Sequence, residues 1–310
     1  MPTLLEATDT FPCFGGTCGA FVIGDGRLGS PEDAVAHVRR RLEGWHLRFS
    51  RFEPDSELSA LNADPRTTIP VSATMLRFAA AVVQAATETG GLVDATLLEP
   101  LEDAGYRTDL GAPVPLELAL RLVRTRRPAR PRADSAWSVI EVDRAAQTVT
   151  RPVGVRLDTG GLAKGLFADI LAAELRRHAS FAVDCAGDLR IGGAKAIPRA
   201  VRVASPFEDR VLHEFELSEG GVATSGIGRR SWLDERGVPA HHLLDPATGR
   251  PAFTGVVQAT ALAPTALGAE ILAKAAVLSG PESARGWLAH GGVLVYDDGE
   301  FEVVDSTLAA

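Results

Sequence analysis

The stretch LDTGGLAKGLFAD, residues 157–169, predicts a strand, a tight turn and a helix. Ahead of it, apolar residues alternate over 153–157 as expected for a strand. After the glycine pair, apolar residues recur at the helical period over 161–178. The rest of the chain is therefore expected to be organised around a buried helix that begins in a glycine turn.

Such a helix start can bind an anion, because its first amides lack partners and glycine lets a phosphate approach the backbone. Lys164 adds a positive charge within the first turn. The alternative is an ordinary strand-to-helix corner in which Asp158 caps the helix. The spacing matches neither the dinucleotide motif GxGxxG nor the phosphate loop GxxxxGKS/T, so neither of those mechanisms is inferred.

Composition predicts a soluble globular protein. Of the 310 residues, 45% are hydrophobic and 23% charged, and the net charge of -8 argues against nucleic-acid binding as the main activity. The three cysteines show no paired metal-ligand spacing, which fits a reducing compartment. The first twenty residues do not resemble a signal peptide, and no stretch approaches 18 apolar residues. We therefore expect a cytoplasmic protein without a membrane partner.

Two segments in the first half carry polar side chains that a ligand could use. The first, FSRFEPDSELSALN at 49–62, follows a predicted helix, and its alternative role is a turn in which Asp55 or Ser56 caps a short helix. The second, LVDATLLEPLEDAGY at 92–106, places Asp94 and Thr96 at alternating spacing. These two can project together into a pocket, or they can cap a loop.

Three later segments also have two readings. In HHLLDPATGRP, residues 241–251, His242 precedes an Asp-Pro turn and is either functional or an exposed surface residue. In the predicted helix 264–278, Glu270 and Lys274 lie one turn apart, where a simple ion pair is the alternative. The basic run 121–132 lacks interleaved aromatics and predicts a solvated loop.

In their order along the chain, these segments resemble the ApbE family, the FAD:protein FMN transferases. The resemblance is carried by GGTCGAF, FSRFEPDSELSALN, VDATLLEPL, LDTGGLAKG, VDCAGDL, VATSG, HHLLDPATGRP and GAEILAKAAVLSG, which span about residues 15–280. It implies one ApbE-like domain over residues 1–310. The implied fold is α+β and related to the T-fold, with two interleaved subdomains and a ligand cleft between them.

The resemblance also implies a reaction. Members of the family cleave FAD at its diphosphate and attach FMN to a threonine of an acceptor flavoprotein as a phosphoester, with AMP leaving and a magnesium ion assisting. Some members mainly hydrolyse FAD. FAD is thus the expected substrate and an acceptor flavoprotein the expected partner. The alternative is an FAD-binding homologue, or an FAD pyrophosphatase, that lacks efficient transfer.

The family's site residues carry over to individual positions of this chain. His242 falls on the catalytic histidine and can act as base or donor, since an unperturbed imidazole titrates near neutrality. The positions implied to bind FAD are Phe52, Asp94, Ala95, Thr96, Asp158, Lys164, Asp188 and Ser225.

The family's metal ligands fall on the Gly161 carbonyl, Glu270 and Lys274. Glutamate offers oxygen to magnesium, whereas lysine would repel the ion or replace part of its charge. One metal position is therefore expected to be lost, and magnesium binding is in question. Further departures from the family pattern at Asp184, Ala186 and Glu99 imply a specialised or weakened enzyme.

Overall fold

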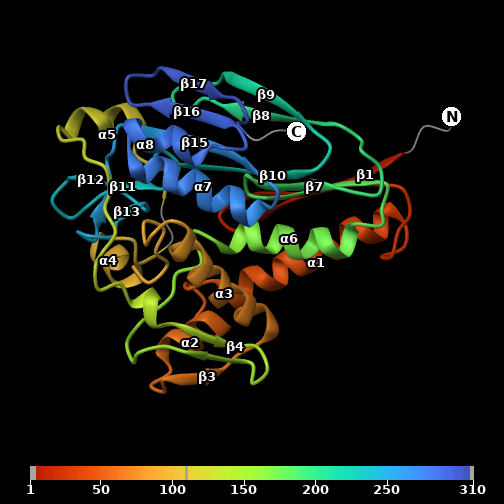
Figure 1. Cartoon of the computed structure of the whole chain (residues 1–310), viewed down its shortest axis with the longest axis horizontal. Coiled ribbons are helices and arrows are strands. Elements are labelled where there is room, and N and C mark those ends of the chain that lie inside the picture. The colour runs from red at the N-terminus through yellow and green to blue at the C-terminus, as the bar shows by residue number, and fades with distance from the viewer. Residues whose placement is uncertain (1–4, 109–110, 308–310) are drawn as a thin grey trace.

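An eight-stranded antiparallel sheet forms the upper half of the protein as it is viewed in Figure 1. The computed structural model describes residues 5–108 and 111–307. The strands follow the order β1-β2-β6-β7-β10-β15-β16-β17, and each neighbouring pair is antiparallel. Their bounds are β1 (Glu6–Cys13), β2 (Gly16–Ile23), β6 (Ser180–Cys185), β7 (Asp188–Gly192), β10 (Gly220–Gly226), β15 (Val256–Ala263), β16 (Gly292–Tyr296) and β17 (Phe301–Val304). This sheet and the separate helices confirm the predicted α+β class.

Three helices cover one face of the sheet, and a hairpin covers part of the other. Helix α1 packs on β1 and β2, α6 on β6 and β7, and α7 on β10 and β15. Behind the sheet, the β8-β9 hairpin brings Val201 and Phe215 against Ile191 and Val222. The elements named here are α1 (Pro31–Phe49), α6 (Ala163–Leu175), α7 (Ala266–Ser279), β8 (Arg199–Ala204) and β9 (Val211–Leu217).

The other elements are short or lie around this core. The helices are α2 (Glu57–Ala63), α3 (Ala73–Glu88), α4 (Leu98–Asp103), α5 (Leu116–Leu122), α8 (Pro281–Ala284) and the 3-10 turns η1 (Ala136–Val139) and η2 (Arg285–Trp287). The strands are β3 (Thr68–Pro70), β4 (Glu141–Asp143), β5 (Thr148–Thr150), β11 (Ser231–Leu233), β12 (Pro239–His241), β13 (Leu244–Asp245) and β14 (Arg250–Pro251). No helix in the described ranges is long and apolar enough to cross a membrane.

Local sequence signals place several of these elements. The Ser30 hydroxyl accepts the Asp33 amide at 3.2 Å, and the Asp33 carboxylate accepts the Ser30 amide at 3.2 Å, so a capping box starts α1. The Ser56 and Ser72 hydroxyls accept the amides of Ser59 and Met75 and so cap α2 and α3. The segment after α5 has no regular structure as far as residue 133, which agrees with the predicted solvated loop.

The expected strand before the central helix is wrong, because residues 151–160 form no strand. Pro152 and Gly154 interrupt the segment, and Leu157 is bonded by a side chain instead of a neighbouring strand. The Asn62 amide donates to the Leu157 carbonyl at 2.9 Å and accepts the Leu157 amide at 2.8 Å. The predicted helix itself is confirmed as α6.

Helices α6 and α7 meet at unusually short range, which brings charged residues of both together. A Cβ on Gly165 would lie 2.7 Å from the Ala266 carbonyl oxygen, so glycine is needed for this approach. The Asp169 carboxylate accepts the amides of Ala266 and Leu267, both at 2.9 Å, and so caps α7. Lys164 on α6 consequently lies beside Glu270 on α7.

Candidate active site

A pocket of about 630 Å³ opens among the loops that follow α1, precede α6 and follow β10 and β12. This volume is typical of sites for small molecules. Of the residues proposed from sequence, those that line it are Phe52, Asp94, Ala95, Asp158, Gly161, Lys164, His242 and Lys274. Those outside the lining are Thr96, Asp188, Ser225 and Glu270.

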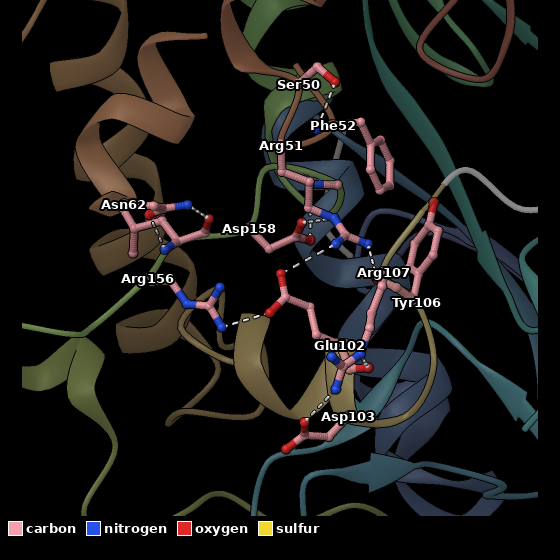
Figure 2. A network of polar contacts seen from close by, with 12 residues as sticks. Ser50, Arg51, Phe52, Asn62, Glu102, Asp103, Tyr106, Arg107, Arg156 and Asp158 are labelled. Atoms are coloured by element: carbon pink, nitrogen blue, oxygen red, sulfur yellow. Dashed lines mark hydrogen bonds and ion pairs between the residues drawn. The ribbon is translucent and has the colours of Figure 1, made fainter. Parts of the chain in front are cut away.

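Arg51 organises the aromatic side of the pocket (Figure 2). Its guanidinium lies over the rings of Phe52 and Tyr106, at 4.3 and 4.4 Å from their centroids. It also donates to the Tyr106 carbonyl at 2.6 Å. The Arg51 side chain is only 8% exposed, so its guanidinium is held firmly against both rings. Phe52 remains 39% exposed and offers its ring to a planar ligand.

The same arginine connects this layer to the glycine turn. Arg51 Nε lies 3.5 Å from Asp158 Oδ1, and its Nη1 lies 3.8 Å from Glu102 Oε1. Glu102 in turn accepts from Arg156 Nη2 at 2.7 Å. Figure 2 shows these carboxylates alternating with the guanidinium groups. Asp158 is therefore part of a network in which acidic side chains alternate with arginines.

Asp94 and Thr96 form a local turn. The Thr96 amide and hydroxyl both donate to Asp94 Oδ1, at 2.8 and 2.6 Å. Asp94 Oδ2 is buried and has no partner among the described residues. Because Asp94 lines the pocket, this oxygen is available to a donor group of a ligand, while Thr96 orients it.

The expectation of free amides at the helix start is corrected by the structure. Asp158 Oδ2 accepts the Gly160 amide at 3.1 Å, as in the alternative corner reading. The amides of Leu162 and Ala163 donate to the Thr159 carbonyl, at 3.3 and 3.1 Å. Since these amides already have acceptors, an anion here would depend mainly on cationic side chains.

Two lysines supply such charge next to the turn. Lys164 forms an ion pair with the buried Asp188 and lies 3.7 Å from Glu270 Oε1. Lys274 Nζ lies 3.3 Å from the same Glu270 oxygen. We call Lys164, Asp188, Glu270 and Lys274 the lysine–carboxylate cluster.

The charges of this cluster stabilise one another. Burial disfavours the Lys164 ammonium, but Asp188 and Glu270 outweigh burial and raise the pKa of Lys164. Burial likewise opposes the Glu270 carboxylate, yet Lys274 and Lys164 lower its pKa. Burial raises the pKa of Asp188 to about 6, although Lys164 acts in the opposite direction. The cluster thus pairs two lysines with two buried carboxyl groups.

The residues that the sequence resemblance assigns to a metal site do not fit a divalent ion. Glu270 Oε1 is shared by two ammonium groups, and Oε2 accepts the Gly165 amide at 3.0 Å. A fixed ammonium about 4 Å from a divalent ion would repel it by on the order of 8 kcal/mol at an effective dielectric constant of 20. Within residues 5–108 and 111–307, no three His, Cys, Asp or Glu side chains are grouped to hold a metal.

Arg229 and Arg230 add positive charge to the pocket. Arg230 Nη2 donates to the Phe14 carbonyl at 3.0 Å, and its Nη1 would be 3.6 Å from a Cβ on Gly160. In the described part of the chain, neither arginine forms an ion pair with a carboxylate. The pocket therefore has two guanidinium groups with no carboxylate at ion-pair distance among the described residues.

His242 lies in this pocket but not in the electrostatic state expected from sequence. Burial lowers its pKa well below the usual value, and Arg230, His241 and Lys274 lower it further. Its Nδ1 atom is buried without a partner among the described residues, which leaves Nε2 as the nitrogen that can face the pocket. The imidazole is thus neutral at physiological pH, as a proton acceptor must be. The neighbouring His241 is only 1% exposed, so His241 and His242 are not a pair of exposed surface residues.

Other positions singled out from sequence lie farther from the pocket. Ser225 is buried on β10, opposite Ala259 of β15. Glu99 is exposed in the first turn of α4. Asp184 accepts the Gly187 amide at 2.7 Å within the β6-β7 turn, and Ala186 occupies the left-handed region there with φ 55°. None of Asp184, Ala186 and Glu99 lines the pocket.

Comparison with known proteins identifies the family. A model of the ApbE family matches residues 17–296. The chain belongs to the ApbE family. The FAD:protein FMN transferase of Treponema pallidum is 28% identical over 269 residues, covering 81% of this chain and 72% of that protein. The Vibrio cholerae FAD:protein FMN transferase is 25% identical over 283 residues, covering 87% and 80% of the two chains.

Solved ApbE structures share the fold. The ApbE protein of Thermotoga maritima superposes with a TM-score of 0.77 at 23% identity, covering 98% of this chain and 97% of that one. The flavin transferase ApbE of Vibrio cholerae gives a TM-score of 0.73 at 20% identity, with 98% of each chain covered. The α+β fold is therefore that of ApbE proteins.

Sequence reasoning missed several residues of the pocket. Arg51 stands within the quoted segment FSRFEPDSELSALN. Its position directly before Phe52 could have indicated that it belongs to the pocket. Arg229 and Arg230 follow the segment VATSG by two residues. Tyr106 closes the segment 92–106, and nothing in the sequence indicates that its ring reaches Phe52, 5.7 Å away between ring centroids.

Proposed function

We propose that this ApbE-family chain is an FAD:protein FMN transferase that binds FAD in the pocket and moves its FMN half onto a threonine of an acceptor flavoprotein. AMP is the second product. The observation that carries the proposal is one pocket that combines exposed aromatic surface, arginines without an ion-pair partner among the described residues, and a neutral histidine. The aromatic side chains suit a flavin ring, and the arginines suit a diphosphate. The neutral histidine can accept the proton of a hydroxyl nucleophile.

The arrangement supports one orientation of FAD. The isoalloxazine ring would lie against Phe52, which Arg51 supports from beneath. The diphosphate would lie at the glycine turn beside Arg230 and Lys274, whose charges face the pocket. Residues from both halves of the chain line the pocket, which supports the T-fold-related arrangement of two interleaved subdomains around a cleft.

In the reaction, the threonine oxygen attacks the phosphorus of the FMN half and a new P–O bond forms. The bond from that phosphorus to the bridging oxygen breaks, and AMP leaves with the electron pair. His242 accepts the hydroxyl proton at Nε2. Bound diphosphate would bring negative charge next to Arg230 and Lys274, which offsets the two cations that lower the pKa of His242.

Purified protein incubated with FAD tests the proposal. We expect release of AMP, and in the presence of an acceptor flavoprotein we expect flavin fluorescence that survives denaturation of the acceptor. An acceptor with its threonine changed to alanine is the control for covalent transfer. AMP release with no labelled acceptor would instead indicate an FAD pyrophosphatase. Saturable FAD binding with no AMP would indicate a binding homologue, and no binding up to millimolar FAD would refute the proposal.

A further inference from the structure

Lysine is rare in this chain, and its positions are informative. Among 32 basic residues only Lys164, Lys195 and Lys274 are lysines, and two of these three share the Glu270 carboxylate. Lysine offers a compact point charge, whereas arginine offers a wide planar fork. Both Lys164 and Lys274 line the pocket, together with the arginines Arg51, Arg229 and Arg230.

Lys274 is built into a position that a ligand can reach. Its side chain is 10% exposed and belongs to the pocket lining, although α7 is otherwise largely buried. A Cβ on Gly161 would lie 2.8 Å from Lys274 Cε, so glycine at 161 leaves the room that this side chain occupies. The ammonium is therefore held between Glu270 and the glycine turn.

The Lys274 ammonium retains donor capacity for a ligand. An ammonium has three N–H donors, and Glu270 Oε1 is its one hydrogen-bond acceptor among the described residues. The lysine–carboxylate cluster is neutral as a whole, because Asp188 and Glu270 balance Lys164 and Lys274. Arg229 and Arg230 add two further guanidinium groups to the pocket lining, and guanidinium groups donate readily to phosphate oxygens.

We propose that the Lys274 ammonium, fixed by Glu270, takes the place of a divalent metal ion, so that this chain binds and cleaves the FAD diphosphate without metal. The inference rests on the proposed function. Lys274 donates to a phosphoryl oxygen while negative charge moves onto the leaving AMP, and its own proton stays on nitrogen. The threonine proton goes to His242, as in the reaction above, and no further reactant is required.

FAD binding measured by calorimetry, in EDTA and in millimolar magnesium chloride, tests the inference. We expect dissociation constants within twofold of each other, equal rates of AMP release in both buffers, and no heat from magnesium titrated into the protein alone. FAD binding or AMP release that occurs only with magnesium would overturn the inference and leave the proposed function standing. Absence of FAD binding in both buffers would overturn both.

A double variant separates the role of Lys274 in binding from its role in folding. Lys274→Met alone leaves the buried Glu270 charge undercompensated and can unfold the chain. Lys274→Met with Glu270→Gln removes one charge of each sign and keeps the side-chain volumes. We expect this double variant to melt near the parent temperature and to bind FAD about 10- to 100-fold more weakly in EDTA.

The exposed Lys195 provides the matched control. Lys195→Met removes a lysine outside the pocket and should leave FAD affinity unchanged. A double variant that binds FAD in EDTA as tightly as the Lys195→Met protein would show that Lys274 does not contact the diphosphate, and would overturn the inference.

Discussion

Replacing Gly165 by alanine should have two effects. It should lower the free energy of unfolding, and it should weaken FAD binding in the pocket. The new Cβ would lie 2.7 Å from the Ala266 carbonyl oxygen and 2.8 Å from Leu267 Cα, and both are backbone atoms that cannot turn aside. Helix α6 must then move away from α7. The move strains the hydrogen bond from the Gly165 amide to Glu270 Oε2, now 3.0 Å long.

The expected magnitude follows from three contributions. Overpacking costs about 1–3 kcal/mol. Loss of a buried hydrogen bond to a carboxylate costs about 1.5–3 kcal/mol. Alanine regains about 1 kcal/mol over glycine within a helix. The free energy of unfolding should therefore fall by about 1.5–5 kcal/mol, measured by urea denaturation monitored by circular dichroism.

Gly44→Ala is the matched control, because Gly44 lies within α1 and a Cβ there would meet nothing within 4 Å. It should raise the free energy of unfolding by about 0.5–1 kcal/mol. If Gly165→Ala were neutral or stabilising like the control, the close contact of α6 with α7 would not exist as described. FAD affinity of folded Gly165→Ala should also fall, since the substitution shifts Glu270 relative to Lys164.

Three further predictions concern the pocket and its pH dependence. His242→Ala should lower the rate of AMP release at least tenfold while FAD affinity stays nearly constant, since a general base acts in the transition state. Single-turnover experiments measure the rate of AMP release, and calorimetry measures the FAD affinity. Phe52→Ala should weaken FAD binding by about three- to tenfold, because the contact between Phe52 and the flavin is lost. Quenching of flavin fluorescence measures this affinity. An affinity equal to that of the parent would show that the Phe52 ring does not contact the flavin. Burial lowers the pKa of His241 from 6.5 to about 3, so below pH 6.5 the unfolded chain binds a proton that the folded chain does not. As the pH falls from 6.5 to 3, His241 therefore reduces the free energy of unfolding by about 1.4 kcal/mol per pH unit, and above pH 6.5 it has no effect. His241→Gln should make the free energy of unfolding less dependent on pH in this range, as measured by urea titrations. An unchanged pH dependence would contradict this prediction.

Local signals in the sequence were sufficient for most helices. Ser30 and Asp33 satisfy amides within four residues of one another, so the start of α1 depends on nothing distant. The family resemblance brought most of the pocket together because its motifs occur in order along the chain. Phe52, Asp94 and His242 do line one pocket, although they are far apart in sequence.

What could not be predicted depends on contacts between distant segments. The alternation at 153–157 suggests a strand, but Asn62, 95 residues before Leu157, supplies its hydrogen bonds. The amides at the start of α6 look free in the sequence, yet Gly165 donates to Glu270, 105 residues later. Burial of His242 and the approach of Arg230 likewise result from tertiary packing, so its lowered pKa had no signal in the sequence.

The brace between α6 and α7, formed by Asp169 and the glycine contact at 165, has a consequence for the entropy of ligand binding. Free lysine side chains lose about 1.5–2 kcal/mol of rotamer freedom when they are fixed. Here Lys164 and Lys274 are already fixed on Glu270 by folding, so the ligand orders neither of them. The diphosphate end of the pocket is thus preorganised, and conformational adjustment on binding should be confined to the exposed Phe52 side.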